Sequence, residues 1–258
     1  MKVLAALDET NAAPAVLAAT HVIARMFAAR VSAVHVLQDG AQRVRELAAA
    51  DRVPLVELEG QPGARLAHAL DDDDDALALV IGTRAQPRER REIGSTALEV
   101  VTTSHKPVLA IPPELSPGFA VHRVLVPLEG SLATSHAPYA ALHVPGATHV
   151  DVVILHVFEE NAVPAFCDQP QHEWEAFDRE FLARYSTWPV DHVRLETRVG
   201  RPDQHILNVA RETDCDMIVL AWAQELAPGR ASIVRETLRR GTIPVMLVPV
   251  RAAGEARV

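Results

Sequence analysis

The feature of this sequence that most constrains its fold is an internal repeat. Shifting the chain by 121 positions aligns KVLAALD at residues 2–8 with RVLVPLE at residues 123–129, and it pairs His35 with His156 without a gap. Further matches follow at a larger shift, because the second half is longer in its middle. Self-similarity on this scale indicates two copies of one fold in series. The proline-rich stretch at 112–120 is the expected linker between them.

Each half alternates short apolar runs with stretches of helical periodicity. The expected strands of the first half are 3–7, 31–37, 55–58, 77–81 and 108–111, and its expected helices are 13–29, 42–50, 64–70 and 94–104. This alternation is typical of a parallel sheet with helices on both faces. We therefore expect two α/β domains, at residues 1–114 and 121–251. Ligands of such sheets bind beyond the carboxyl ends of the strands.

The composition is that of an ordinary soluble protein and excludes several classes of function. The chain has 258 residues, of which 48% are hydrophobic and 23% charged. Its net charge of −9 argues against general affinity for nucleic acid, and no apolar stretch approaches membrane-spanning length. Cys167 and Cys215 form no metal or redox motif, and the first residues do not resemble a secretion signal. We expect a cytoplasmic protein.

An arginine-rich loop joins the fourth expected strand of the first half to its last helix. In the stretch VIGTRAQPRERREIGSTALEV at residues 80–100, the part before Gly94 holds four arginines and two glutamates, and then Gly94, Ser95 and Thr96 open the helical pattern. The first turn of a helix leaves backbone N–H groups unpaired and carries a partial positive charge, which suits a phosphate. The alternative is that Ser95 and Thr96 only cap the helix.

Several weak signals occur in one order, and occur twice. They are the strand ending in Asp8, the His35-Val36 pair, the Gly60-x-Pro62 turn, and Gly82 followed by Pro107-Val108-Leu109. In this order they resemble the universal stress protein family in its tandem form. The resemblance implies two doubly wound five-stranded parallel sheets of strand order 3-2-1-4-5, similar to the adenine-nucleotide alpha hydrolases. It also implies that the halves pair within one chain through their fifth strands, at 108–111 and 245–248, and it leaves a homodimer open.

The nucleotide-binding branch of this family carries a spaced glycine motif that the first half keeps in outline. In that branch a glycine, two residues, a second glycine and nine residues precede Gly-Ser or Gly-Thr. Here Gly82 is present, Ala85 replaces the second glycine, and eight residues separate Ala85 from Gly94. Alanine fits only where φ is not strongly positive, and the shorter loop must take a tighter path.

The resemblance assigns roles to residues of the first half. It implies that Asp8 contacts a ribose or a metal, that the backbone of Val36 meets an adenine, and that the first turn at Gly94 holds phosphates. The complete candidate set is Ala6, Asp8, Val36, Ile81, Gly82, Arg84, Ala85, Gly94, Ser95 and Thr96. The expected ligand is ATP or AMP, with or without Mg²⁺.

The second half departs from the same pattern at several of these positions. Glu129 replaces Asp8, Ala221 replaces Gly82 with Trp222 beside it, and Gln224 stands at the position of Ala85. A phosphate there would meet side chains where it needs bare backbone. We expect this half to be a structural partner of the first half, or to contain a pocket for a different ligand.

Other clusters of polar residues favour structural roles. The acidic run at 71–75 is expected to be a solvated turn, because five consecutive carboxylates cannot all face one ion. His136 and His143 lack cysteine or carboxylate partners at the spacing of zinc ligands. His35 and His156 close equivalent strands and are expected to make structural hydrogen bonds.

These observations lead to one functional expectation and two rivals. We expect a stress-response protein that binds an adenine nucleotide in its first domain and acts through a change of conformation or oligomeric state. The first rival is a tandem scaffold, or a binder of another small molecule. The second is an enzyme acting on nucleotides, but the chain lacks a Walker motif and a catalytic triad spacing, so at most weak ATP hydrolysis is expected.

Overall fold

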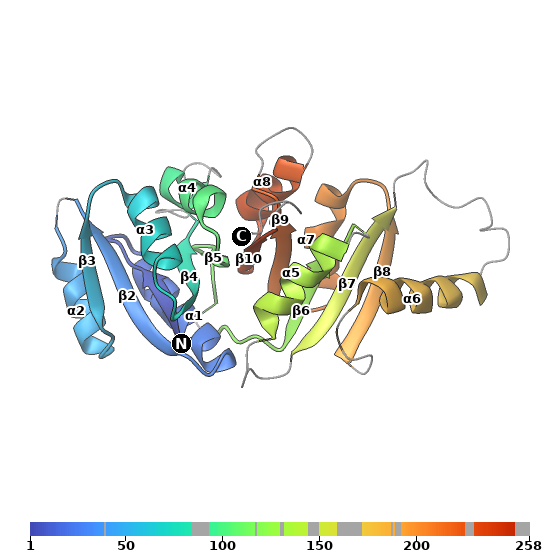
Figure 1. Ribbon diagram of the computed structural model, residues 1–258, viewed down its shortest axis with the longest axis horizontal. Helices are drawn as coiled ribbons and strands as arrows, with labels where there is room; N and C mark the ends of the chain where they lie inside the picture. The colour runs from blue at the N-terminus through green and yellow to red at the C-terminus, as the bar shows by residue number, and fades with distance from the viewer. Residues whose placement is uncertain are drawn as a thin grey trace, which may run out of the picture.

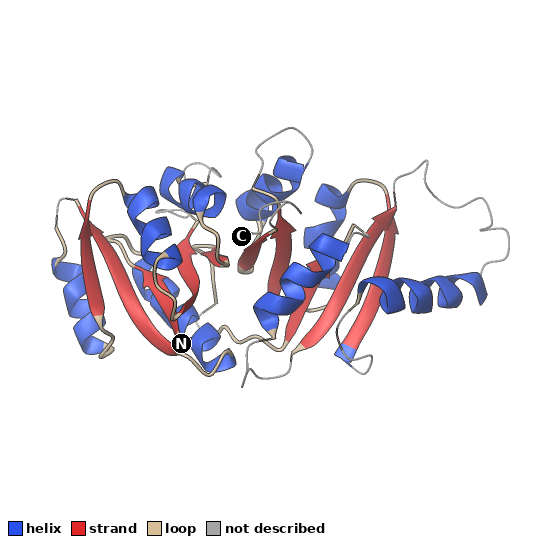
Figure 2. Ribbon diagram, viewed as in Figure 1, coloured by secondary structure: helices blue, strands red, loops and turns tan. Residues whose placement is uncertain are grey.

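A computed structural model describes residues 1–38, 40–83, 93–116, 118–129, 132–143, 150–158, 172–186, 188, 192–224 and 230–250. In this part of the chain ten strands form one sheet that is flanked by helices on both faces (Figures 1 and 2). The strands are β1 Lys2–Ala6, β2 Arg30–Leu37, β3 Leu55–Glu59, β4 Ala76–Gly82, β5 Val108–Ile111, β6 Arg123–Pro127, β7 Asp151–Phe158, β8 Val193–Val199, β9 Met217–Trp222 and β10 Val245–Pro249. The helices are α1 Ala13–Met26, α2 Gln42–Ala50, α3 Pro62–Asp71, α4 Ser95–Thr103, α5 Leu132–Leu142, α6 His172–Tyr185, α7 Pro202–Glu212 and α8 Arg230–Arg240.

The strand order confirms the expected fold and the expected pairing of the halves. It reads β3-β2-β1-β4-β5-β10-β9-β6-β7-β8. The first five strands have the order 3-2-1-4-5, and the last five have the same order in the reverse direction. Neighbours within each half are parallel, whereas β5 and β10 are antiparallel, with Leu109 opposite Met246. Figure 1 shows β5 and β10 meeting at the centre of the molecule. The fifth strands therefore join the halves within one chain.

The central strands are buried on both faces, as strands of a parallel sheet must be. Along β1, Val3 and Ala5 belong to the core layer that contacts α1, α2, α5 and α6. Leu4 and Ala6 belong to the opposite layer, which contacts α3, α4, α7 and α8. This alternation follows the two-residue period of a strand. The helices of each half thus cover both faces of the sheet, which is the doubly wound arrangement.

Helix α1 ends three residues earlier than its periodicity predicts, at Met26 instead of residue 29. The chain turns because Ala28 adopts a left-handed conformation with φ 50°. The N–H of Ala29 then donates to Ala24 O at 2.8 Å, and the N–H of Ala28 to Arg25 O at 3.2 Å. This pair of bonds is a Schellman motif, which usually has glycine at the left-handed position. Alanine at that position gave no sequence signal for the helix end.

The two Gly-x-Pro turns adopt the same backbone conformation in both halves. Gly60 and Gly200 each have φ 123°, which side-chain-bearing residues rarely adopt, so glycine is required at both positions. Pro62 and Pro202 then begin α3 and α7, where the missing N–H has no intrahelical partner to lose. The repeat read from the sequence therefore extends to individual turns.

The acidic run at 71–75 ties neighbouring segments together. The Asp71 carboxylate accepts hydrogen bonds from Ser104 Oγ at 3.0 Å and from the backbone N–H of His105 at 2.9 Å. Asp73 pairs with Lys2 Nζ at 2.6 Å. In the described part of the chain, no group of three or more histidine, cysteine, aspartate or glutamate residues is arranged to hold a metal ion.

None of the described helices is long and apolar enough to cross a membrane.

Cys215 is expected to react slowly in the folded protein. Its side chain is buried beside Thr213, with Sγ 3.1 Å from Thr213 Oγ1, and burial raises the pKa of the thiol. Because the thiolate is the reactive form, native protein at about pH 8 should be alkylated by iodoacetamide at least about ten-fold more slowly than urea-unfolded protein.

The alkylation is best measured in a Cys167→Ser background, because Cys167 lies outside the described residues. The raised pKa means that folding favours the protonated thiol. Its contribution to stability is therefore present below the ordinary thiol pKa and is lost as the pH rises through the folded value. Equal alkylation rates for native and unfolded protein would contradict this account of Cys215.

Candidate functional site

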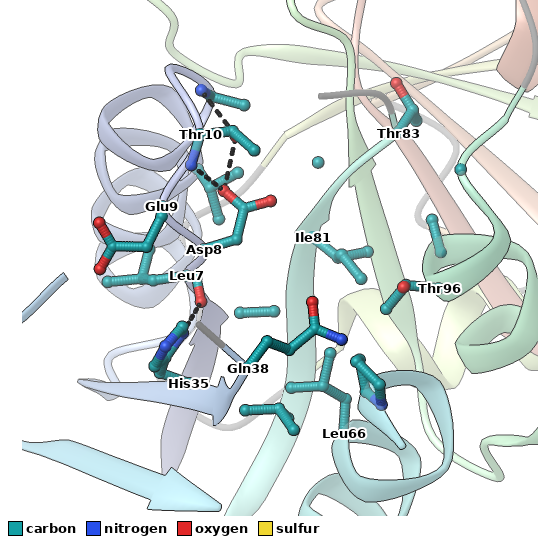
Figure 3. A pocket seen from close by; sticks show the side chains of 18 of the residues that line it. Leu7, Asp8, Glu9, Thr10, His35, Gln38, Leu66, Ile81, Thr83 and Thr96 are labelled. Carbon is teal, nitrogen blue, oxygen red and sulfur yellow. Dashed lines mark hydrogen bonds between the residues drawn. The ribbon is translucent and has the colours of Figure 1, made fainter. Parts of the chain in front are cut away.

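A cavity of about 580 Å³ lies at the carboxyl ends of β1 and β4, where the winding direction of the first half reverses (Figure 3). Eight of the ten residues singled out in the sequence line this one cavity: Ala6, Asp8, Val36, Ile81, Gly82, Gly94, Ser95 and Thr96. The remaining two, Arg84 and Ala85, lie outside the described residues. The structure thus brings together positions that are up to 90 residues apart in the sequence.

Asp8 follows β1 and is fixed through one of its two carboxylate oxygens. Asp8 Oδ1 accepts hydrogen bonds from the Thr10 N–H at 3.0 Å and from Thr10 Oγ1 at 2.6 Å. Among the described residues, the second oxygen, Oδ2, has no hydrogen-bond partner. Figure 3 shows that oxygen turned away from Thr10, toward the side of the cavity where Ile81 lies. A carboxylate held in this way can accept a hydrogen bond from a hydroxyl group or bind a cation.

The N-terminus of α4 forms the opposite side of the cavity. Gly94 is the N-cap residue, and no side chain caps the helix. The first helical bond runs from Leu98 N–H to Gly94 O at 3.0 Å. Within the described structure, the N–H groups of Ser95, Thr96 and Ala97 therefore have no acceptor. The alternative that Ser95 and Thr96 only cap the helix is wrong, because neither hydroxyl does so.

Gly94 is held in place by the end of β4. Its N–H donates to Thr83 O at 2.8 Å. Thr83 is 2% exposed, and its own N–H and Oγ1 both donate to Ile111 O in β5. This chain of contacts fixes the start of α4 relative to the sheet. The φ of Gly94 is −59°, which any residue can adopt, so glycine is not needed there for backbone geometry.

His35 closes the cavity on the side of β2. Its Nδ1 lies 2.8 Å from Leu7 O and its Nε2 lies 3.1 Å from Gly40 O, so the ring joins the end of β1 to the segment before α2. His156 occupies the equivalent position in the second half, with Nδ1 2.9 Å from Leu128 O. The expectation that both histidines make structural hydrogen bonds is confirmed.

Sequence reasoning missed several lining residues. Gln38 follows β2 directly, Thr83 follows β4 directly, and Leu66 lies in α3 beside the cavity. The rule that ligands bind beyond the carboxyl ends of parallel strands could have identified Gln38 and Thr83. Leu66 gave no comparable signal, because a helical leucine facing the sheet reads only as core.

The charge of the cavity sets a condition on its ligand. The described lining includes the carboxylates of Asp8 and Glu9 but no lysine or arginine. Glu9 is partly engaged, since its Oε1 accepts a hydrogen bond from the Val44 N–H at 3.4 Å. An anionic ligand would therefore depend on the partial positive charge of α4, or on a cation bound with it.

The second half has a large side chain at the position equivalent to Thr83, one of the residues that line the first-half cavity. Trp222 ends β9 at the position that Thr83 holds after β4. Its indole is 3% exposed and belongs to the same core layer as Ile206 of α7 and Leu238 of α8, the counterparts of α3 and α4. Trp222 Nε1 has no hydrogen-bond partner among the described residues. That the second half does not bind nucleotide remains a prediction, which this packing supports.

The comparison with known families agrees with the topology. The model of the universal stress protein family matches residues 120–249, about half of the chain. The chain belongs to the universal stress protein family. The match covers the second half, whereas the cavity described above lies in the first half of this universal stress protein.

Solved structures share the fold along almost the whole chain. A universal stress protein from Archaeoglobus fulgidus is similar at 18% identity, with 96% of this chain and 98% of that chain covered and a TM-score of 0.70. A structure described as a putative universal stress protein from Pseudomonas aeruginosa is similar at 11% identity, covering 96% and 92%, with a TM-score of 0.70. These likenesses show that the tandem arrangement of this chain occurs in other members of the fold.

Close packing of α3 against α4 supports the cavity wall and gives a stability prediction. A Cβ added to Gly63 would lie 2.7 Å from Glu99 Cβ, closer than real side chains approach. Gly63→Ala should therefore destabilise the protein by about 1 kcal/mol, because a clash of about 2 kcal/mol outweighs the gain in helix propensity. Gly40→Ala is the matched control, since nothing lies within 4 Å of its added Cβ. Urea unfolding measures both, and equal stabilities would contradict the prediction.

Proposed function

We propose that this universal stress protein binds an adenine mononucleotide, ATP or AMP, in the cavity of its first half. We propose further that it acts through a change of conformation or oligomeric state. The observation that carries the binding proposal is the pairing of two unsatisfied groups across one cavity. The unpaired N–H groups of α4 lie on one side and the free oxygen of Asp8 lies on the other.

Each group suits a different part of a nucleotide. Helix N-termini bind phosphates through their N–H groups and partial positive charge. A carboxylate that has one fixed and one free oxygen suits a ribose hydroxyl. The lining between β2 and α3 includes Val36 and Leu66, which give an apolar surface for a base. The volume of about 580 Å³ lies within the usual range for small-molecule sites.

A divalent cation fits the same arrangement. Mg²⁺ is usually bound through one or two carboxylates together with phosphate oxygens of the ligand. Asp8 Oδ2 can supply such a ligand without giving up a hydrogen bond. When bound, the cation would neutralise phosphate charge beside Asp8 and Glu9. ATP should therefore depend on Mg²⁺ more strongly than AMP does.

Binding, and not turnover, is the activity that the described residues support. His35 is the ordinary candidate for a general base in the lining, but both of its ring nitrogens lie against backbone carbonyl oxygens. It is therefore engaged in structure and is not directed at a water molecule in the cavity.

Isothermal titration with ATP and AMP, each with and without Mg²⁺, tests the proposal. We expect binding that is weakened at least about ten-fold by Asp8→Ala, as for the loss of a contact to a charged group. Glu129→Ala makes the equivalent change in the second half and should leave the affinity unchanged. The absence of heat with both nucleotides up to about 1 mM would overturn the proposal and favour the binder of another small molecule.

A further inference from the structure

Gln224, which lies two residues beyond β9, has an unusual backbone conformation. It is one of four non-glycine residues with positive φ in the described chain, with φ 60°. The other three, Ala28, Arg52 and Asp214, each follow the end of a helix, where the left-handed conformation is common. Gln224 follows a strand. A strained residue in such a place persists only where surrounding contacts fix it.

The contacts that fix Gln224 come from the other half of the molecule. Its Nε2 donates to Val101 O at 3.2 Å and to Ser104 O at 2.5 Å. Both carbonyl groups belong to the last turn of α4 and the residue that follows it, and the last carbonyl groups of a helix have no partner within the helix. The side chain of a second-half residue therefore satisfies the C-terminus of a first-half helix.

Helix α4 is the element that presents N–H groups to the nucleotide cavity. It has nine residues, about two and a half turns, so its two ends lie close together. Its C-terminus is held within its own half by Asp71, which binds Ser104 Oγ and the His105 N–H. Gln224 adds a second attachment at the same end, from across the β5–β10 junction. A shift of this end displaces the N–H groups of Ser95 and Thr96 at the opposite end.

We propose that Gln224 is a positioning residue for the first-half site. By binding the last carbonyl groups of α4, it sets where the N-terminus of that helix lies in the cavity. The segment after β9 in the second half thereby controls nucleotide affinity in the first half. This inference rests on the nucleotide binding proposed above. In the sequence, Gln224 stands at the position that Ala85 holds in the first half.

Four substitutions at position 224 test this role. Gln224→Ala removes the amide and keeps the strained backbone, and Gln224→Gly removes the amide and the strain together. Both should weaken ATP binding about five-fold or more, as for coupling between two sites. Gln224→Glu places negative charge at the negative end of α4 and should weaken binding further. Gln224→Lys supplies a new donor to the same carbonyl groups and should restore affinity to within about two-fold of the wild type.

Two measurements separate positioning from a general loss of stability. Affinity is measured by titration at a temperature where every variant is fully folded. Ile206→Val, which trims a buried side chain of α7, serves as a destabilised control and should bind ATP as the wild type does. Hydrogen exchange of the amides at residues 98–104 should become faster in Gln224→Ala and return toward the wild-type rate in Gln224→Lys.

The outcomes also separate this inference from the function on which it rests. Wild-type affinity in both Gln224→Ala and Gln224→Gly would overturn the positioning role. Equal losses in Gln224→Lys and Gln224→Glu would also overturn it, because the two side chains differ in their ability to donate. If the wild type binds no nucleotide, the proposed function fails. The hydrogen-exchange rates at residues 98–104 then decide whether Gln224 holds the C-terminus of α4 in place. Faster exchange in Gln224→Ala supports this role, and unchanged rates overturn it.

Discussion

Ser95→Pro is expected to weaken nucleotide binding at least about ten-fold while leaving the protein as stable as before. Ser95 is the first residue of α4, a position that proline favours because the missing N–H has no intrahelical partner. Gly94 has φ −59° and ψ 140°, which is the conformation preferred before proline. The substitution therefore removes one N–H from the proposed phosphate site. A hydrogen bond to a charged group contributes about 1.5–3 kcal/mol, or at least about ten-fold in affinity.

Ser95→Ala is the matched control, because it removes the hydroxyl and keeps the N–H. We expect an affinity within about three-fold of the wild type, and the difference between the two variants isolates the backbone donor. Titration with ATP and Mg²⁺ measures affinity, and urea unfolding measures stability. If Ser95→Pro folds and binds as tightly as the wild type, the α4 N-terminus does not hold the phosphate.

Trp222→Thr is expected to destabilise the second half by about 3–5 kcal/mol, the usual cost of removing a large buried aromatic side chain. The variant gives the second half the residue that the first half has at Thr83. The cost arises because the indole is 3% exposed and belongs to the core layer that α7 and α8 cover. Urea unfolding, followed by a probe of the second half, measures the loss.

Trp222→Phe separates the ring from its N–H group. Because Trp222 Nε1 has no hydrogen-bond partner among the described residues, the indole N–H is buried at a cost of about 1–3 kcal/mol. Phenylalanine loses some apolar area but removes that cost, so the free energy of unfolding should change by less than about 1 kcal/mol. Wild-type stability in Trp222→Thr would show that the indole does not fill the second half as described.

The fold could be predicted because its signals are local and repeated. Short apolar runs separated by helical periodicity define α/β halves, and the match of His35 to His156 places the two copies in register. The strand order and the β5–β10 pairing came from the resemblance to the universal stress proteins, since no local pattern specifies which strands are neighbours. The structure confirms both.

The candidate site was predictable only in part. Asp8 and the start of α4 lie at strand and helix ends, where general rules direct attention, and the structure places them around one cavity. Their role in binding a nucleotide remains a prediction. The contact of Gln224 with Ser104 could not be foreseen, because it joins residues 120 positions apart and depends on a backbone conformation that glutamine seldom adopts.

The antiparallel pairing of β5 with β10 gives this molecule an approximate dyad inside a single polypeptide. Where identical subunits meet across a dyad, each amino-acid replacement is made on both sides at once. Here Thr83 and Trp222 are encoded separately, although they hold equivalent positions. Covalent linkage therefore permits the two halves to differ in a way that two identical subunits could not. The first half keeps its cavity, and the second half can carry a large side chain at the equivalent position without closing that cavity.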